Sequence, residues 1–400
     1  MSKPGTISSF ELIELAMPMK TPFVHARAAR TLAENLLVRL VLDGKEGIGE
    51  GVPRDYVTGE SLASAYDAIG ELDLGAIERD LDLTSFATAV LSIEALDLPR
   101  RLQQGANLGL AAACTVELAL LDAVGKIFDK PLRAIGEVIP IPVALRQTEK
   151  WYPISYALDM SATPAEQRKK WRTLPSHFKV KIGTTPEEDL ARVRAVREAF
   201  GDGISLATDV NMAWTLEQAI AIQPSMAACA IAWHEEPFQQ RRWADCRAFR
   251  EATGAKIMLD ESLCSYADGE TAIGERACDY FNIRLSKCGG LIAALRLVLL
   301  GHQHGIGFQV GAQIGEMAVL CAAARHLHGI VRGAVGYEGS NVTARFDVQI
   351  ADPPLWVDRE HARVAEQPGP GLGVVIAPAG LKAAHRRSVI LRRDTLSASL

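Results

Sequence analysis

The sequence predicts an α/β fold built around a (β/α) barrel, with an α+β domain in front of it. From about residue 141 onward, strand and helix patterns alternate strictly through seven βα units. That number exceeds what an open flavodoxin-like sheet usually needs and points to a barrel. The first 135 residues instead read as three strands followed by helices, which is the order of an α+β domain. A chain of 400 residues has room for both parts.

Composition and charge exclude several classes of protein. The chain is 48% hydrophobic and 23% charged, which is ordinary for a globular protein. A net charge of −5 with mixed signs implies no nucleic-acid or membrane-surface partner, and we find no apolar run of the length that spans a bilayer. The seven cysteines are scattered without paired spacing, and no apolar segment of a signal peptide follows Met1. We therefore expect reduced thiols and a cytoplasmic location.

The first domain is predicted to be a small antiparallel meander covered by helices. Its strands are expected at 10–15, 36–42 and 47–51, with Asp43-Gly44 as the turn signal between the last two. Two segments read as loops, 20–33 and 52–60. The second carries Arg54 and Tyr56, so it is a candidate for contact with a ligand. Helical patterns cover 62–71, 82–95 and 108–128.

The barrel pattern then runs to about residue 327. Its strands are expected at 153–158, 178–183, 204–211, 231–236, 256–261, 280–287 and 307–311. Its helices are expected at 164–174, 186–200, 216–226, 241–253, 269–275, 292–304 and 316–327. The stretch 355–400 reads as loop-rich.

One barrel strand is unusual because it carries two lysines. Side chains alternate along a strand, so Lys179 and Lys181 must point to the same face. Lysines protect exposed sheet edges, and that interpretation suits the strand in isolation. A closed barrel has no edge, however, so the pair is expected to face a polar site inside it.

Charged residues recur at the ends of the predicted barrel strands, where barrel enzymes hold their active sites. Successive members of the set lie 25 to 29 residues apart, the length of one βα unit, and are therefore expected at the same level around a ring. The set is Lys181, Asp209, Glu235, Asp260, Lys287 and Glu316.

The three carboxylates of this ring predict a metal site. Asp209, Glu235 and Asp260 come from neighbouring strands and would repel one another without a cation. All-oxygen ligation suits Mg²⁺ or possibly Mn²⁺, and no thiolate or imidazole set suited to zinc accompanies it. Asn211 shares the face of Asp209 and is expected to orient it or a bound water.

The ring lysines fit acid–base chemistry beside such a metal. A nearby cation and the charge of Lys179 would both lower the pKa of Lys181 toward the range of a general base. Lys287 follows four strands later and would face Lys181 across the barrel mouth. A substrate carboxylate on the metal would have its α-carbon between them, and the cation would stabilise the enediolate left by proton loss.

These motifs resemble the enolase superfamily, and within it the muconate cycloisomerase (muconate lactonizing enzyme / mandelate racemase) subgroup. The resemblance covers nearly the whole chain and is carried by the Lys-x-Lys strand, Asp209-x-Asn211, Glu235-Glu236-Pro237, Asp260-Glu261-Ser262, Lys287-Cys288-Gly289-Gly290 and Pro370-Gly371-Leu372-Gly373.

The resemblance implies a (β/α)7β modified TIM barrel with an N-terminal α+β capping domain. It divides the chain into a capping domain (1–135), a barrel (141–355) and a C-terminal segment (356–400) that packs back on the capping domain. It implies an Mg²⁺ enzyme in which Lys181 and Lys287 are the acid/base pair and Lys179 lowers the pKa of Lys181. Segments 20–33 and 52–60 become the loops that close over substrate. Further residues expected beside the site are Glu261, Gln313, Glu316 and Glu338.

The reaction itself stays open among several alternatives. A muconate-type cycloisomerase is the leading one, because Glu338-Gly339 is similar to a glutamate that lactonizing enzymes have there. Dipeptide epimerases of the subgroup often carry Asp-x-Asp where this chain has Ala334 to Ser340, which argues against that type. A racemase or epimerase of an amino-acid derivative is the next alternative, followed by a dehydratase of the o-succinylbenzoate synthase type.

Two other classes are weaker. A catalytically silent barrel scaffold should have a broken site position, and the ring has none. A metal-dependent hydrolase should show histidines near the strand ends as ligands, and these are absent from the sequence. The expected partners are a small carboxylate substrate and further copies of the chain, as a dimer or octamer.

Overall fold

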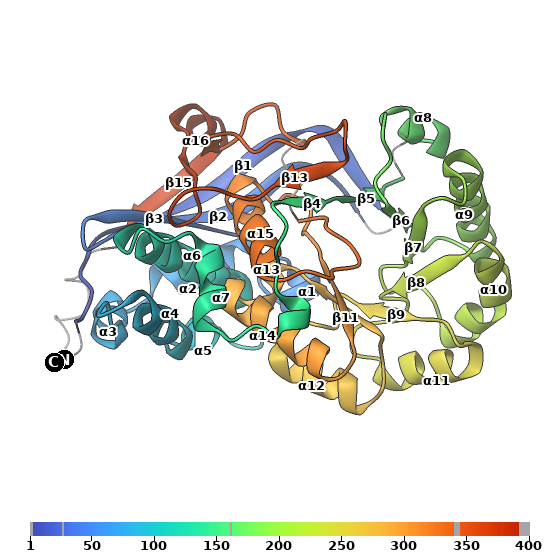
Figure 1. Ribbon diagram of the computed structural model, residues 1–400, viewed down its shortest axis with the longest axis horizontal. Coiled ribbons are helices and arrows are strands. Elements are labelled where there is room, and N and C mark those ends of the chain that lie inside the picture. The colour runs from blue at the N-terminus through green and yellow to red at the C-terminus, as the bar shows by residue number, and fades with distance from the viewer. Residues whose placement is uncertain (1–2, 26–27, 161, 340–344, 392–400) are drawn as a thin grey trace.

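The protein folds around two sheets of different kind. The computed structural model describes residues 3–25, 28–160, 162–339 and 345–391. One sheet has four antiparallel strands and the other has seven parallel strands (Figure 1). The predicted α/β class, with an α+β part in front of the barrel, is therefore confirmed.

The antiparallel sheet contains both ends of the described chain. Its strand order is β15-β1-β2-β3, and the strands are β1 (Ile7–His25), β2 (Ala28–Leu42), β3 (Lys45–Gly51) and β15 (His385–Ile390). Asp43 and Gly44 have φ of 45° and 76° between β2 and β3, so the predicted turn is present.

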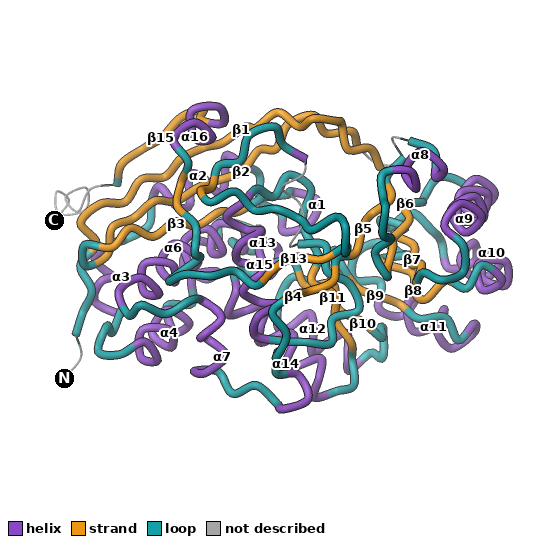
Figure 2. Tube along the Cα trace, turned by 45° about the horizontal axis from the view of Figure 1, so that its top comes forward, coloured by secondary structure: helices purple, strands orange, loops and turns teal. Residues whose placement is uncertain are grey.

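The segment 20–33, predicted as a loop, belongs to a long hairpin instead. Phe23 pairs with Arg30 and His25 with Ala28, beyond an irregularity between Pro18 and Phe23, while residues 26 and 27 lie outside the described part. The ladder is interrupted between Pro18 and Phe23 and resumes beyond, because an irregularity of this kind absorbs extra residues without ending the pairing. The far ends of β1 and β2 extend toward β5 and β6 of the barrel (Figures 1 and 2).

Short helices and one long helix cover the antiparallel sheet. They are α1 (Asp55–Thr58), α2 (Leu62–Gly70), α3 (Leu74–Asp80), α4 (Phe86–Ala95), α5 (Leu98–Leu102), α6 (Leu110–Ile127) and α7 (Ile135–Val138). Helix α6 is buried along almost its whole length and lies against β3. The close approach explains a glycine in that strand, because a Cβ atom at Gly49 would lie 2.0 Å from the carbonyl oxygen of Thr115.

The parallel sheet is the barrel wall. Its strands are β5 (Ser155–Leu158), β6 (His177–Lys181), β7 (Ser205–Asp209), β8 (Ile231–Glu235), β9 (Ile257–Leu259), β10 (Tyr280–Ile283) and β11 (Gly307–Val310), and they follow one another in this order. Its helices are α8 (Pro164–Lys169), α9 (Pro186–Phe200), α10 (Leu216–Ala228), α11 (Trp243–Thr253), α12 (Tyr266–Gly274), α13 (Leu285–Cys288), α14 (Leu291–Gln303) and α15 (Ala318–Ile330).

The gap between β5 and β11 is bridged by the segment 335–338, which has no regular strand of its own. The backbone N–H groups of Val335 and Glu338 donate to Phe308 and Val310 of β11. The carbonyl of Tyr337 accepts a hydrogen bond from the N–H of Ser155 in β5. The lysine strand β6 thus lies inside a closed wall, and an edge-protecting role for its lysines is wrong.

The chain after the barrel is more regular than predicted. Strand β13 (Arg363–Ala365) pairs with β4 (Trp151–Pro153), and β12 (Ala351–Asp352) pairs with β14 (Val375–Ile376). Helix α16 (Pro378–Ala384) then leads into β15, which pairs with β1. Residues 392–400 of the expected C-terminal segment lie outside the described part. The domain boundaries at 135, 141 and 356 stay a prediction.

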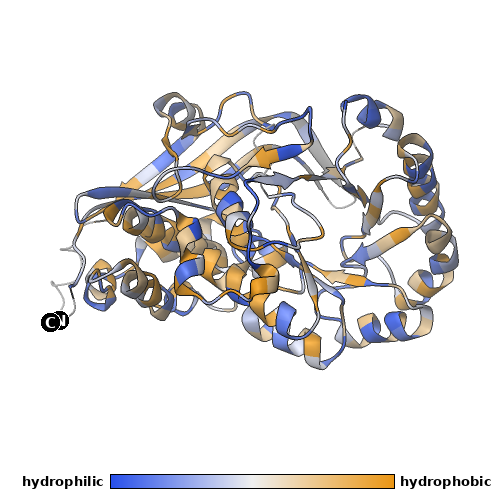
Figure 3. Ribbon diagram, in the orientation of Figure 1, coloured by the Kyte–Doolittle hydropathy of each residue, from blue (hydrophilic) through white to orange (hydrophobic). Residues whose placement is uncertain are grey.

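Two buried carboxylates connect the capping helices and sheet to the barrel. Glu117 of α6 accepts hydrogen bonds from the N–H groups of Leu291 and Ile292 at the start of α14. Glu50 of β3 accepts from Met317 and Leu320 at the start of α15. Helices α6, α14 and α15 are strongly apolar where they meet, whereas α9 to α11 present polar faces outward (Figure 3). No helix in the described ranges combines the length and apolar character needed to cross a membrane.

Candidate active site

The lysines of β6 are buried in the barrel interior. Lys179 is 1% exposed and Lys181 is 6% exposed, although both carry ammonium groups. Groups of this kind are rarely buried without charged partners. Each lysine here has such partners on neighbouring strands.

The carboxylates expected in a ring stand beside these lysines. In the sheet, Lys181 is level with Asp209, and Asp209 is level with Glu235. Asp260 directly follows the end of β9. All three carboxylates are fully buried. The regular spacing in the sequence therefore corresponds to adjacent positions at one end of the barrel.

Lys287 reaches the site by a different route from the one predicted. Strand β10 ends at Ile283 rather than at Lys287, and the chain turns at once into the single-turn helix α13. The Nζ atom of Lys287 donates to the backbone oxygen of Asp260 at 2.6 Å and lies 3.1 Å from its Oδ1. The side chain is completely buried.

Each of the two outer carboxylates contacts one member of the pair Lys181 and Lys287. Lys181 Nζ is 2.5 Å from Asp209 Oδ2 and 3.0 Å from Asn211 Oδ1. Lys287 is bound to Asp260, as described above. Because Glu235 stands between Asp209 and Asp260 in the strand order, the ammonium groups of Lys181 and Lys287 flank the row of carboxylates.

Lys179 lies one level deeper and links several acids. Its Nζ atom is 2.7 Å from Glu235 Oε1, 3.1 Å from Glu338 Oε2 and 3.4 Å from Asp209 Oδ2. Glu338, on the segment 335–338 that bridges β5 and β11, thus lies beside the site, as the sequence predicts.

Neighbouring carboxylates raise the pKa values of two of these lysines. Burial opposes the charged form of Lys179, but Glu235, Glu338 and Asp209 outweigh it and hold its pKa well above the ordinary value. For Lys287, burial is likewise outweighed, chiefly by Asp260, and its pKa is raised.

Arg284 and Asn282 belong to the site but were missed in the sequence. The buried guanidinium of Arg284 donates to Asp260 and lies 3.6 Å from Glu235 Oε1. The amide of Asn282 donates to Glu235 Oε1 at 3.1 Å. The available signal was the spacing of Arg284 and Lys287, three residues apart, which brings side chains together on a helical turn but not on a strand.

The loops after β7, β8 and β9 fix the carboxylate row from above. Asn211 donates to Glu261 Oε1 at 3.2 Å, so these two predicted residues are in contact. Glu236 turns away from the row and accepts from the backbone N–H groups of Asp260 and Ser262. Asn211 and Glu236 have φ of 48° and 36°, an uncommon region for these residue types outside tight turns. Glu236 therefore positions Asp260, and Glu235 is the residue that faces the site.

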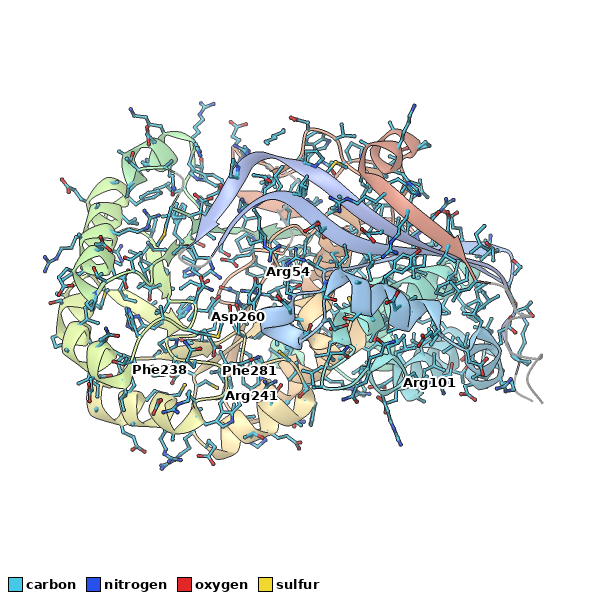
Figure 4. The ribbon with its side chains drawn as sticks, turned by 180° about the vertical axis from the view of Figure 1, so that it is seen from behind. Arg54, Arg101, Phe238, Arg241, Asp260 and Phe281 are labelled. Carbon is cyan, nitrogen blue, oxygen red and sulfur yellow. The ribbon has the colours of Figure 1, made fainter. Side chains whose placement is uncertain are left out.

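The remaining predicted residues lie between the barrel and the capping domain. Glu316 and Gln313 follow β11, and Glu316 Oε1 accepts from the N–H of Gln313 at 2.7 Å. Arg54 is buried, and its guanidinium donates to the backbone oxygens of Pro53, Glu34 and Ile314. It lies between the capping sheet and Asp260 in Figure 4. Tyr56 is 40% exposed on α1. Arg54 thus fixes loops, and direct contact of either residue with substrate stays a prediction.

The donor set fits a divalent cation. Asp209, Glu235 and Asp260 are buried carboxylates on neighbouring strands, and Glu235 Oε2 has no hydrogen-bond partner within the described part of the chain. Within the described ranges, no three acidic, histidine or cysteine side chains already stand as a group that could hold an ion. Ammonium and guanidinium groups contact these carboxylates instead, so ligation requires them to give way. All-oxygen donors of this kind suit Mg²⁺.

Comparison with known proteins identifies the family. Residues 163–380 match the family model described as enolase C-terminal domain-like, which is more than half of the chain. The chain belongs to the enolase superfamily. The resemblance seen in the motifs is thereby confirmed.

Curated relatives of this superfamily member cover nearly all of it. It is 30% identical over 374 residues to a D-Ala-D/L-Ala epimerase of Cytophaga hutchinsonii, with 92% of this chain and 95% of the relative covered. It is 27% identical over 375 residues to an N-succinyl-L-Arg/Lys racemase of Bacillus cereus, with the same coverage. These relatives are isomerases of the superfamily, and so is this chain.

Solved structures agree with this fold. The Bacillus cereus racemase superimposes with a TM-score of 0.82 at 25% identity, covering 98% of this chain and 100% of that one. A dipeptide epimerase of Cytophaga hutchinsonii, in complex with Mg and the dipeptide D-Ala-L-Val, gives 0.81 at 25% identity, covering 96% and 100%. A muconate lactonizing enzyme of Pseudomonas fluorescens also gives 0.81, with 96% and 100% covered, but its 24% identity supports the fold alone. Enzymes of this superfamily transfer a proton at the carbon α to a carboxylate, and the relatives support this chemistry for the present enzyme.

Proposed function

We propose that the protein is an Mg²⁺-dependent racemase or epimerase of an N-acylated amino acid. One observation carries the proposal: the ammonium groups of Lys181 and Lys287 flank the buried row of Asp209, Glu235 and Asp260. An α-carbon held over that row is within reach of a base from two sides. Inversion at a carbon needs this arrangement, because the proton must leave one face and return on the other.

The side chains divide the work as follows. One lysine, in its neutral form, accepts the α-proton, and the other, as an ammonium, delivers a proton to the opposite face. Lys179 and Arg284 remain charged beside the carboxylates. Since the whole cluster is buried, water is excluded and each electrostatic contact is strengthened.

Asp209, Glu235 and Asp260 are the proposed ligands of the cation. When bound, a divalent cation supplies the positive charge that offsets the negative charge gained by the substrate carboxylate as the α-proton leaves. Asn211 and Glu261 orient the ligands from the loops above.

The curated relatives favour an amino-acid derivative over a muconate as substrate. Those covering nine-tenths of the chain act, by name, on an N-succinyl amino acid and on dipeptides. In this chain the segment 334–339 lacks the Asp-x-Asp that would hold the α-ammonium of a dipeptide, and Glu338 is already bound to Lys179. Ser340 lies outside the described residues. An N-acyl group without a free ammonium suits this site best.

A muconate-type cycloisomerase is the second candidate. The observation that favours it is Glu338, whose carboxylate reaches Lys179 at the site. In that reaction Lys181 would protonate the enolate formed by ring closure. A dehydratase would need general-acid help for a leaving hydroxyl.

The test is a wash-in of solvent deuterium into candidate carboxylates with MgCl₂, followed by NMR. The panel contains N-acetyl and N-succinyl amino acids, dipeptides, and cis,cis-muconate. We expect deuterium at the α-carbon of an N-acyl amino acid together with inversion. Ring closure of muconate, with no exchange into any N-acyl amino acid, would replace the proposal by the second candidate.

A further inference from the structure

The loop after β11 holds a buried side chain that the mechanism above does not use. Gln313 is 2% exposed, and neither its Oε1 nor its Nε2 atom has a hydrogen-bond partner among the residues that the structure describes. An unpaired buried amide is costly, so such a group calls for a partner from outside the chain.

Gln313 lies just beyond an inward-facing position at the end of β11. Asn282 and Gln309 are level in β10 and β11, and Asn282 reaches Glu235 inside the barrel. A Cβ atom at Gly311 would lie 2.0 Å from Asn282 Oδ1, so position 311 faces the same interior. Strand β11 ends at Val310, and residues 311–313 lead from it to the turn at 314–315. The buried amide of Gln313 thus lies two residues past an inward-facing position, at the carboxyl end of the barrel wall.

The backbone around Gln313 is held firmly. Its own N–H donates to Glu316, as described above. Three residues of the capping domain hold the turn that follows: Arg54 donates to Ile314 O at 2.7 Å, Asn35 donates to Gly315 O at 2.8 Å, and Glu50 accepts from Met317 N at 2.7 Å. A side chain on such a support can discriminate between ligands, because it cannot relax away from a poor one.

Building on the proposed function, we propose that Gln313 is a specificity residue that binds the N-acyl amide of the substrate. A carboxamide offers one acceptor and one donor group. An N-acyl amino acid also has both, an N–H and an acyl oxygen, next to the α-carbon. Muconate has carboxylate acceptors only and leaves Oε1 of Gln313 facing negative charge. An α-ammonium has donors only and leaves Nε2 unpaired.

The experiment compares an amide with its ester. The fastest N-acetyl amino acid of the exchange panel is paired with the O-acetyl hydroxy acid of the same side chain, which lacks the N–H. The ratio of their kcat/KM values is measured for the wild-type enzyme, for Gln313→Met and for Gln167→Met. Gln167 is a buried glutamine of α8 that bonds to Asp159 O, and it serves as the control.

We expect the preference for the amide over the ester to fall about 10- to 100-fold in Gln313→Met, because the buried N–H of the amide substrate is then left unpaired. The preference should be unchanged in Gln167→Met. A folding defect would lower both rates together and leave the ratio intact. An equal ratio in wild type and Gln313→Met would overturn the assignment while the racemase proposal stands. If no N-acyl amino acid exchanges at all, the proposed function fails, and this assignment fails with it.

Discussion

Glu235 is the residue on which the buried cluster is centred. Its Oε1 atom contacts Lys179 and Asn282 and lies near Arg284, while its Oε2 atom has no partner among the described residues. The neighbouring Glu236 lies just past the end of β8 with a φ of 36° and accepts from backbone N–H groups instead. Adjacent glutamates thus have unrelated tasks because the chain leaves the strand conformation between them.

The first prediction concerns this carboxylate. Glu235→Gln keeps the shape and removes the charge, so we expect Mg²⁺ affinity to fall about 100-fold or more, beyond what loss of an outer-sphere partner typically costs. Isothermal titration with MgCl₂ measures this without substrate. Glu217→Gln, an exposed change on α10, should bind like wild type. Unchanged affinity in Glu235→Gln would remove Glu235 from the ligand set.

At the residue scale, the sequence predicted the positions that share a register and missed those that depend on a local turn. Lys181, Asp209 and Glu235 were found because each βα unit repeats the same path. Arg284 was missed because a strand was expected to continue to Lys287, and alternation along it separates these two side chains. The early end of β10 and the turn α13 bring both to Asp260.

Among the elements, β3 and α6 approach each other closely in the capping domain. Gly47, Gly49 and Gly51 alternate along β3, and a Cβ atom on any of them would meet the backbone or a side chain of α6 within 2.1 Å. The strand can approach the helix this closely only without side chains on that face.

Gly49→Ala should therefore destabilise the protein, by about 1–3 kcal/mol as for other overpacked sites. Urea unfolding followed by circular dichroism measures the free energy of unfolding. Gly70→Ala is the matched control, because nothing lies within 4 Å of its added Cβ and the residue is helical. The control should keep or slightly raise stability. Equal stabilities of the two variants would contradict the packing argument.

The elements that the sequence did not predict are those whose pairing is distant along the chain. Strand β15 exists because it pairs with β1, 370 or more residues away, and local composition does not reveal that contact. The hairpin end at 20–33 pairs across an irregularity, which interrupts the local strand pattern. The barrel strands were predicted well because their apolar character is local and their helices intervene regularly.

Across the whole molecule, buried acids join the capping helices to the barrel. Burial raises the pKa of Glu117 to about 8, although the N–H groups at the start of α14 oppose the shift. The ordinary value is 4.5, so between these two values the folded state binds more protons than the unfolded state. Stability from this group is therefore full below the lower value and is lost as pH rises toward 8.

We expect Glu117→Gln to lose less stability than wild type between pH 5 and pH 8. Each unit of difference between the folded-state and unfolded-state pKa values of Glu117 changes the free energy of unfolding by about 1.4 kcal/mol. Urea unfolding at both pH values measures it, and Glu137→Gln on the exposed side of α7 is the control. Parallel pH profiles for wild type and Glu117→Gln would show that Glu117 does not titrate in this range.

In the proposed reaction, two lysines act on one α-carbon from opposite faces. The most direct measurement is deuterium wash-in to each enantiomer of the best N-acyl amino acid, with Lys181→Ala, Lys287→Ala and the double variant. We predict that neither single variant racemises its substrate, that each still exchanges one enantiomer, and that the two variants exchange opposite enantiomers. The double variant should exchange neither. Exchange of the same enantiomer by both single variants, or wild-type exchange by the double variant, would contradict the account.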